Sequence, residues 1–399
     1  MKILTLCTYP IKSPQHGGQF RVQNIVNAYR KWGYSVQVVG VLGSDAYELE
    51  DGFLAFPGNQ ELSRFIPNPF LMEDYALGRL FGSEDLFYSR LKRLISSPPD
   101  VIHVEQPWLF DFAARYRREN VPNAKIIYGS QNIECHLKRV ILQFYFEEKV
   151  AQQGASLIEK VEIGAIEGAD GIMCVSEGDA IWTKAQSTKP IALVPNGVKS
   201  WQASEAGRNE AAIHTKGLRY ALYCASAHPP NVIGFFELFG GGFGSLKPDQ
   251  KLVIAGSAGW SIAGDVRVHQ SPKLAERVIP LGVVSQPCLE GLLDGAHCIV
   301  LPLTLGGGTN LKTAEAIFSG KYVIATSCAT RGFERFIGSN GFYLADSASE
   351  FKRALRIAMN SPVLKLSAAE IESRRSVLWD NCFKEIPDFL ELLVKGDKK

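Results

Sequence analysis

The chain has 399 residues, which is too long for one ordinary hydrophobic core and predicts two domains of similar size. Hydrophobic residues make up 46% and charged residues 21%, as in a soluble globular protein. The 43 basic and 41 acidic side chains leave a formal charge of +2, so charge gives no reason to expect a nucleic-acid partner.

The N-terminus and the cysteines indicate a compartment. The opening residues, MKILTLCTYP, hold an apolar run that is too short for a signal peptide and is typical of a first β-strand. No stretch reaches the roughly 18 apolar residues that span a bilayer. None of the eight cysteines forms a CxxC pair, and most lie in apolar runs, as reduced, buried thiols do. We therefore expect a cytoplasmic protein without structural zinc, able to touch the inner face of a membrane.

Short apolar runs alternate with longer segments of helical pattern along the whole chain. Runs that are apolar nearly throughout indicate parallel strands covered by helices on both faces. Two such sets predict an α/β fold of two doubly wound, Rossmann-like domains, with ligands at the carboxyl ends of the strands and a default active site in a cleft between the domains. The expected strands cover 2–7, 35–42, 101–105, 125–130, 171–176, 191–196, 219–225, 251–257, 278–284, 298–303, 322–326 and 342–346.

A polar segment after Val198 lacks any apolar period and marks the domain boundary. We expect an N-terminal domain at 1–198 and a C-terminal domain at 199–370. The remaining 371–399 carries apolar residues at helical spacing, and we expect it to form a helical tail that returns to the N-terminal domain.

Polar residues follow several strands of the first half. Gly17 and Gly18 predict a flexible loop, with Arg21 at the start of the next helix. His103 is expected in a strand core. Further on, 131–134 (QNIE) either holds a ligand hydroxyl or caps the next helix, through Gln131, Asn132 and Glu134. In the linking turn, Asn196 and Gly197 tolerate positive φ, and Ser176 is expected to cap its helix.

The stretch GGGTNLKTAEAIFSG, which follows the strand at 298–303, is the most informative. Its glycines allow tight turns and close approach of a ligand, and Thr309 or Asn310 can cap the following helix. The first N–H groups of that helix suit a phosphate, to which Lys312 adds a point charge. Glu315 lies on the same helix face, where its carboxylate can accept two hydrogen bonds from a ribose diol. The alternative is a surface Lys312–Glu315 pair.

This stretch resembles the donor site of GT-B glycosyltransferases of family 4, the glycosyl transferases group 1 domain. In that family the second Glu of a Glu-x7-Glu motif binds the nucleotide ribose and corresponds to Glu315, while the first corresponds to Gly307. The "GxGTxxK" form assigns Lys312 to the diphosphate. The resemblance extends in order over residues 1–361 and implies donor contacts at Gly307, Gly308, Thr309, Asn310, Leu311 and Glu315.

The same resemblance implies roles elsewhere. Gly17, Gly18 and Arg21 would serve the donor phosphates and the acceptor. Glu105 stands where relatives have a sugar-contacting histidine, so Glu105 and Lys312 are the catalytic candidates. Other positions that the resemblance assigns to the ligand are Gln131, which replaces a histidine, Asn132, Ser226, His228 and Asn231, which replace an Arg/Lys pair, and Val283, near the base.

The function that follows is transfer of a sugar from a UDP- or GDP-sugar to a glycan or lipid-linked glycan, with retention, without a metal or other cofactor, in bacterial surface polysaccharide biosynthesis. Two alternatives stay open. One is a GT-B sugar-nucleotide epimerase, which needs no acceptor, and the other is a non-catalytic nucleotide- or glycan-binding partner. The segments 63–81 and 140–146 are unusually apolar. Three interpretations stay open for them: they surround an acceptor groove, they rest on lipid, or they form ordinary helix core.

Overall fold

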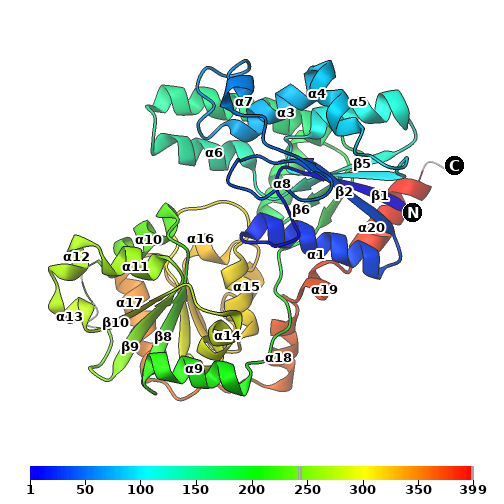
Figure 1. The fold of residues 1–399 in the computed structure, drawn as a ribbon. Coiled ribbons are helices and arrows are strands. Elements are labelled where there is room, and N and C mark those ends of the chain that lie inside the picture. Colours follow the sequence, from blue (N-terminus) through cyan, green and yellow to red (C-terminus); the bar gives the residue numbers. More distant parts are fainter. Residues whose placement is uncertain (241, 243–244, 397–399) are drawn as a thin grey trace. The chain divides into compact units, whose positions relative to one another are not determined.

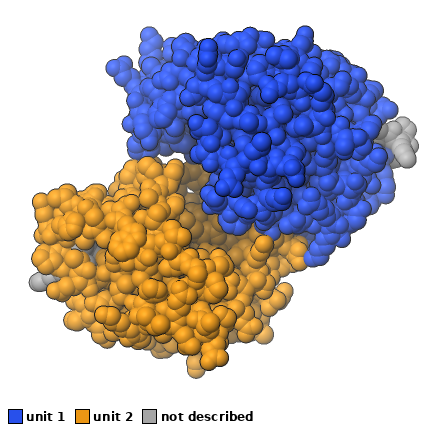
Figure 2. All heavy atoms as spheres, in the orientation of Figure 1, with its two compact units in different colours: residues 1–195, 382–399 blue, residues 196–381 orange. Residues whose placement is uncertain are grey.

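The computed structural model describes residues 1–240, 242 and 245–396, and it divides into two compact units, coloured separately in Figure 2. The first unit contains Met1–Pro195 and the chain from Cys382 onward, and the second contains Asn196–Asn381. The division lies a few residues before the expected boundary at 198. Of the expected tail, the part up to Asn381 belongs to the second unit.

The first unit is built on a seven-stranded parallel sheet in the order β3-β2-β1-β4-β5-β6-β7. Figure 1 labels β1, β2, β5 and β6 of this sheet. Strand β1 pairs with both β2 and β4, so strand order reverses between β1 and β4. The loops that follow these two strands therefore flank a topological switch point. The strands are β1 (Lys2–Cys7), β2 (Ser35–Val41), β3 (Phe53–Leu54), β4 (Val101–Glu105), β5 (Lys125–Ser130), β6 (Gly171–Cys174) and β7 (Ile191–Leu193).

Helices connect these strands, and the last helix of the chain also belongs to this unit. That helix packs tightly on the sheet, since a Cβ on Gly171 would lie 2.6 Å from Cζ of Phe389. Glycine at 171 thus lets the helix approach β6 closely. The helices are α1 (Gly17–Lys31), α2 (Asn59–Leu62), α3 (Glu73–Ser83), α4 (Asp85–Lys92), α5 (Phe110–Asn120), α6 (Glu134–Gln143), α7 (Glu148–Gly168), α8 (Glu177–Gln186) and α20 (Ile386–Lys395).

The second unit repeats the plan with a six-stranded parallel sheet in the order β10-β9-β8-β11-β12-β13. Successive residues Leu222 and Tyr223 of β8 enter two different hydrophobic clusters, so both faces of this sheet are buried. Strand order reverses between β8 and β11. The strands are β8 (Arg219–Cys224), β9 (Gln250–Ala255), β10 (Val278–Gly282), β11 (Cys298–Leu301), β12 (Tyr322–Ala325) and β13 (Phe342–Leu344).

The helical elements of the second unit are 3 to 13 residues long. They are α9 (Glu205–Thr215), α10 (Pro229–Phe239), α11 (Ala258–Ala263), α12 (Val266–His269), α13 (Pro272–Ala275), α14 (Gln286–Gly295), α15 (Leu311–Phe318), α16 (Ser327–Thr330), η1 (Glu334–Phe336), α17 (Ala348–Asn360), α18 (Ala368–Arg375) and α19 (Trp379–Cys382), whose last residue belongs to the first unit.

Every strand expected from the sequence is present, and six of the eight cysteines are buried. Strand β3 was not expected because two residues are too short to show a period. Neither Asn196 nor Gly197 has positive φ. Glycine at 197 is explained by packing, since its Cβ would lie 2.9 Å from the carbonyl oxygen of Val377. Within the described residues, no helix combines the length and the apolar character needed to cross a bilayer.

Candidate functional site

Two loops of the second unit meet at its switch point. One follows β8 and carries Ser226, His228 and Asn231, and the other follows β11 and leads through 306–310 into α15. Because β8 and β11 are neighbours, both loops leave the same edge of the sheet. This is the position at which open α/β sheets bind ligands.

A hydrogen-bonded chain joins the two loops. Nζ of Lys312 donates to Oδ1 of Asn231 at 2.9 Å, and Nδ2 of Asn231 donates to the carbonyl oxygen of Ser226 at 2.9 Å. Asn310 caps α15, since its Oδ1 accepts from the backbone N–H of Lys312 at 3.0 Å. The structure thus brings together Ser226, Asn231, Asn310 and Lys312, as the sequence predicted for one ligand.

Lys312 has no acidic partner in the part of the chain that the structure describes. Its ammonium bonds a neutral amide, and no carboxylate oxygen of a described residue lies within 4.0 Å of Nζ. The surface Lys312–Glu315 ion pair that the sequence left open is therefore not formed. A half-buried lysine at the positive end of a helix, without a counter-ion, is an electrostatic receptor for an anion.

Burial shifts the pKa values of Lys312 and Glu315 so that each charged form is disfavoured. Burial lowers the pKa of Lys312 to about 8, although Cys224 and Glu315 oppose the shift. Burial also raises the pKa of Glu315 to about 7, against the field of Lys312. The Glu315 carboxylate makes no hydrogen bond to any described residue. Two groups with perturbed pKa values that act on each other without forming an ion pair are typical of functional sites.

The glycine-rich loop before α15 has its own unmet hydrogen-bonding capacity. Gly306 and Gly308 have φ of 143° and 56°, conformations that favour glycine. The hydroxyls of Thr304 and Thr309 are buried and find no partner among the described residues. Buried hydroxyls are normally satisfied, so both are available to a bound molecule.

The sequence analysis missed Arg331, whose Nη2 donates to the carbonyl oxygen of Gly306. Arg331 is the C-cap residue of α16, the four-residue helix that follows β12, and β12 is the strand next to β11. The rule that selected the glycine-rich loop, that ligands bind at the carboxyl ends of the strands, therefore points to this region too. Its guanidinium is a second cation beside this loop.

Other predicted residues lie further out on the second unit. Ser226 and His228 are exposed, and burial and the charge of Lys312 lower the pKa of His228. Leu311, the first residue of α15, is half-buried. Val283 follows β10, the edge strand, and the residue is 85% exposed.

In the first unit, Gly17 and Gly18 do not form a flexible loop. They are the first residues of α1, and Oε1 of Gln19 accepts from the backbone N–H of His16 at 3.2 Å to cap it. A Cβ on Gly18 would lie 2.8 Å from Oε1 of Gln131, so glycine lets the helix start against that side chain.

Glu105 and Arg21 are buried, which differs from the ligand contacts expected of them. Glu105 is 1% exposed and Arg21 is 0% exposed, with Oε1 of Glu105 3.6 Å from Nε of Arg21 and 3.2 Å from Nε2 of His103. Burial opposes ionisation, but Arg21, His103 and Gln131 hold the pKa of Glu105 below its ordinary value. Nη1 of Arg21 donates to the carbonyl oxygen of Val194. Both side chains therefore position neighbours instead of facing a ligand.

The neighbour that they position is Gln131, whose Nε2 donates to Oε2 of Glu105 at 2.7 Å and to the hydroxyl of Tyr9 at 2.5 Å. His103 is a core residue, hydrogen-bonded through Nδ1 to the hydroxyl of Tyr29. Ser176 caps α8 as expected.

The segment 131–134 does not cap α6 as one alternative proposed. Glu162, from α7, accepts from the backbone N–H groups of Glu134 and Cys135 at 2.8 and 3.0 Å. Asn132 instead donates to Oε1 of Glu134, which also accepts from Gln106. A cap supplied by another helix leaves no local sequence signal.

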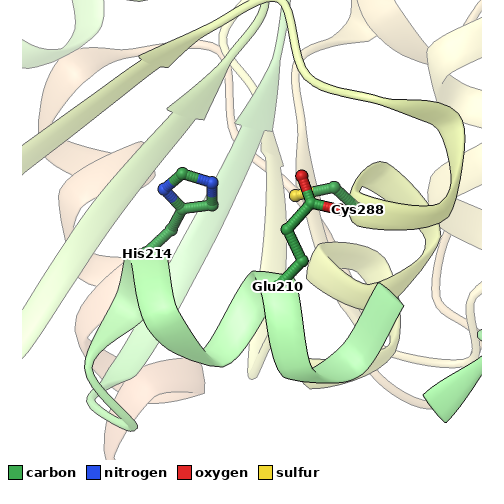
Figure 3. Close-up of side chains that lie close together, drawn as sticks. All are labelled: Glu210, His214 and Cys288. Atoms are coloured by element: carbon green, nitrogen blue, oxygen red, sulfur yellow. The ribbon is translucent and has the colours of Figure 1, made fainter. Parts of the chain in front are cut away.

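One group of potential metal ligands occurs among the described residues. Oxygen, nitrogen and sulfur atoms of Glu210, His214 and Cys288 all lie within 4.8 Å of one another, with the first two on α9 and the third on α14 (Figure 3). Burial and Glu210 raise the pKa of Cys288 to about 11, so its thiol stays protonated at neutral pH. Ser285 donates to Glu210 at 3.1 Å. None of these residues belongs to the loops at the switch point.

Comparison with known proteins gives two family matches. Residues 16–200 match the model described as Glycosyltransferase Family 4, and residues 237–361 match the model described as Glycosyl transferases group 1. These ranges together take in most of the chain. Comparison with curated protein sequences gives no significant match.

Solved structures share the fold at low sequence identity. Sucrose-phosphate synthase from Thermosynechococcus elongatus is 16% identical with a TM-score of 0.73, covering 99% of this chain and 100% of its own. HepE of Anabaena, solved with UDP and glucose, is 12% identical with a TM-score of 0.65, covering 98% and 99%. The catalytic domain of starch synthase IV from Arabidopsis thaliana, solved with ADP and acarbose, is 12% identical with a TM-score of 0.64, covering 99% and 98%.

Proposed function

We propose that this chain, which belongs to the GT-B glycosyltransferases of family 4 type, transfers a sugar from a UDP- or GDP-sugar to a glycan or lipid-linked glycan. The reaction proceeds with retention at the anomeric carbon. Its place is bacterial surface polysaccharide biosynthesis in the cytoplasm, at the inner face of the membrane.

The observation that carries the proposal is the ammonium of Lys312, half-buried at the start of α15 and bonded to a neutral amide. Burying a cation without a counter-ion is costly, and a bound anion removes that cost. A diphosphate suits this place because it also accepts hydrogen bonds from the first N–H groups of α15. The unpartnered hydroxyls of Thr304 and Thr309 add two donors.

Lys312 is proposed as the catalytic residue, acting on the leaving diphosphate. Negative charge grows on the diphosphate as the bond between its oxygen and the anomeric carbon of the sugar breaks. A fixed cation stabilises that charge more in the transition state than in the ground state. Glu315 holds the ribose diol, and Arg331 supports the glycine-rich loop through its hydrogen bond to the carbonyl oxygen of Gly306. We propose that these groups replace a metal ion, and that the reaction needs no cofactor.

The structural neighbours support a nucleotide-sugar donor. One was solved with UDP and glucose, another with ADP and acarbose, and the trehalose-6-phosphate protein of E. coli with UDP-2-fluoro glucose. This chain shares their fold over nearly its whole length.

The first unit is proposed to receive the acceptor and to touch the membrane. Phe70, Phe144 and Tyr145 are 46%, 50% and 56% exposed, and the rings of Phe70 and Tyr145 meet edge to face at 5.5 Å. A group of exposed aromatic side chains marks an interaction surface. The same segments also contribute core, since Leu80 and Phe81 are buried.

A thermal-shift screen of UDP- and GDP-sugars tests the donor, because a ligand at 100 times its Kd stabilises the fold by about 2.7 kcal/mol. Nucleotide release is then measured with and without glycan acceptors, and the anomeric configuration of the product is read by NMR. Release that depends on acceptor supports transfer. A new sugar nucleotide formed without acceptor identifies an epimerase, and binding without turnover identifies a non-catalytic partner.

A further inference from the structure

The first unit contains a pocket of about 410 Å³ at the carboxyl ends of β1 and β2 and beside the end of β4. It lies at the switch point of this sheet, where a ligand is expected. The side chains that give it its chemistry are Tyr9, His16, Asp45, Glu73, Asp74 and Gln106. The volume suits one or two sugar rings.

Carboxylates dominate the charge of this pocket. Asp45, Glu73 and Asp74 line it, and among its described lining residues none is lysine or arginine. Lys138, outside the lining, offsets Asp74 in part: its Nζ lies 3.9 Å from Oδ2 of Asp74 and also donates to the carbonyl oxygen of Leu71 at 2.7 Å. Carboxylate oxygens accept hydrogen bonds from sugar hydroxyls and repel phosphate.

The single imidazole of the pocket does not offset this charge. His16 bonds the hydroxyl of Tyr47 through Nε2 at 3.1 Å, and its ring meets that of Tyr9 edge to face at 5.2 Å. Burial lowers the pKa of His16, although Asp74 opposes the shift. The ring is thus neutral near pH 7, and with the two tyrosines it offers the apolar faces that sugar-binding pockets combine with polar groups.

Several groups of the pocket are held in fixed positions. Thr8 donates to Oδ1 of Asp74 at 3.3 Å, and a Cβ on Gly43 would lie 2.8 Å from that oxygen. Gln106 has a φ of 63°, which is rare for a residue other than glycine, and donates from Nε2 to Oε1 of Glu134. Strained backbone of this kind clusters at functional sites because the surrounding structure must hold it.

We infer that this pocket binds the acceptor as an uncharged saccharide and rejects its phosphate ester. The inference rests on the proposed function and adds the acceptor class to it. Three carboxylates without a lining lysine or arginine make a phosphate unfavourable by charge repulsion, which is selection against a competitor and not only for the substrate.

Binding to the full chain is measured by calorimetry without donor, so that turnover is not needed. The probes are glucose, galactose, mannose and N-acetylglucosamine, each paired with its 6-phosphate. We expect at least one uncharged sugar to bind and its phosphate to bind at least about tenfold more weakly. Asp45→Asn should reduce this discrimination severalfold. The control is Glu48→Gln, which removes one exposed charge from the same loop outside the pocket.

Equal or tighter binding of the phosphates overturns the inference, as does an Asp45→Asn variant that discriminates as well as the wild type. Failure of all uncharged probes to bind also overturns it. UDP binding, measured on the same samples, separates the two proposals. If no saccharide binds while UDP still binds, only the inference about the acceptor class is refuted. If no nucleotide binds, the proposed function itself is refuted.

Discussion

Replacing Lys312 by alanine is the sharpest test of the donor site. The variant loses a cation that donates to the neutral amide of Asn231. The carboxyl of Glu315, whose pKa Lys312 lowers, can take up a proton once that cation is gone, so the fold should persist. Losing one preorganised contact to developing charge costs about 2.7–4 kcal/mol, or about 10²–10³ in rate. We therefore expect kcat to fall by that factor while the donor KM changes little, because the contact strengthens mainly in the transition state.

Steady-state kinetics with the identified donor measures this loss, with Lys365→Ala as the control, since Lys365 is an exposed lysine of the same unit. Lys312→Arg should restore activity only in part, because a planar fork does not replace a point charge. A Lys312→Ala variant with nearly wild-type kcat would refute the reasoning and require another group to neutralise the diphosphate.

The pH dependence gives the same test a second readout. Lys312 is charged below its pKa of about 8, so kcat/KM should fall as pH rises above that value. Glu315 is ionised above its pKa of about 7, so kcat/KM should also fall below it, giving a narrow optimum. Lys312→Arg should abolish the alkaline fall, since arginine does not titrate there. An alkaline limb that survives in that variant would belong to another group.

Three further predictions concern other regions. Glu105→Gln leaves the guanidinium of Arg21 buried without a carboxylate, and denaturant unfolding should show a loss of about 3–5 kcal/mol; unchanged stability with lost kcat would return Glu105 to a catalytic role. Arg331→Ala frees the carbonyl of Gly306 and should weaken donor binding by about tenfold, which calorimetry would detect, whereas unaltered affinity would make Arg331 a surface residue. Replacing both Phe144 and Tyr145 by serine should reduce the fraction of protein that sediments with anionic liposomes at low salt. A wild-type chain that binds no liposomes would exclude membrane contact through these side chains.

The sequence predicts the sheets well because buried parallel strands are apolar runs, and Lys2–Cys7 and Cys298–Leu301 show this plainly. It also predicts the group around Lys312, since loops after neighbouring strands meet at one edge. The sequence alone cannot show which polar side chains are buried. Arg21 and Glu105 were therefore expected to face a ligand, whereas in the structure they face each other. Likewise, Glu162 of α7 caps α6, and this contact between residues far apart in sequence arises only from the tertiary structure.

The two units have similar sheets, yet their switch points carry opposite charge, and we propose that this difference divides the substrates between them. At the edge of the second sheet stand a helix N-terminus, Lys312 and two unsatisfied hydroxyls, all of which favour an anion. At the edge of the first sheet stand Asp45, Glu73 and Asp74, which disfavour one. A diphosphate offered both sites would therefore prefer the second unit, because in the first unit three carboxylates would replace the cation of Lys312. We therefore propose, from charge and independently of the resemblance that first suggested it, that the second unit takes the donor and the first unit takes the acceptor.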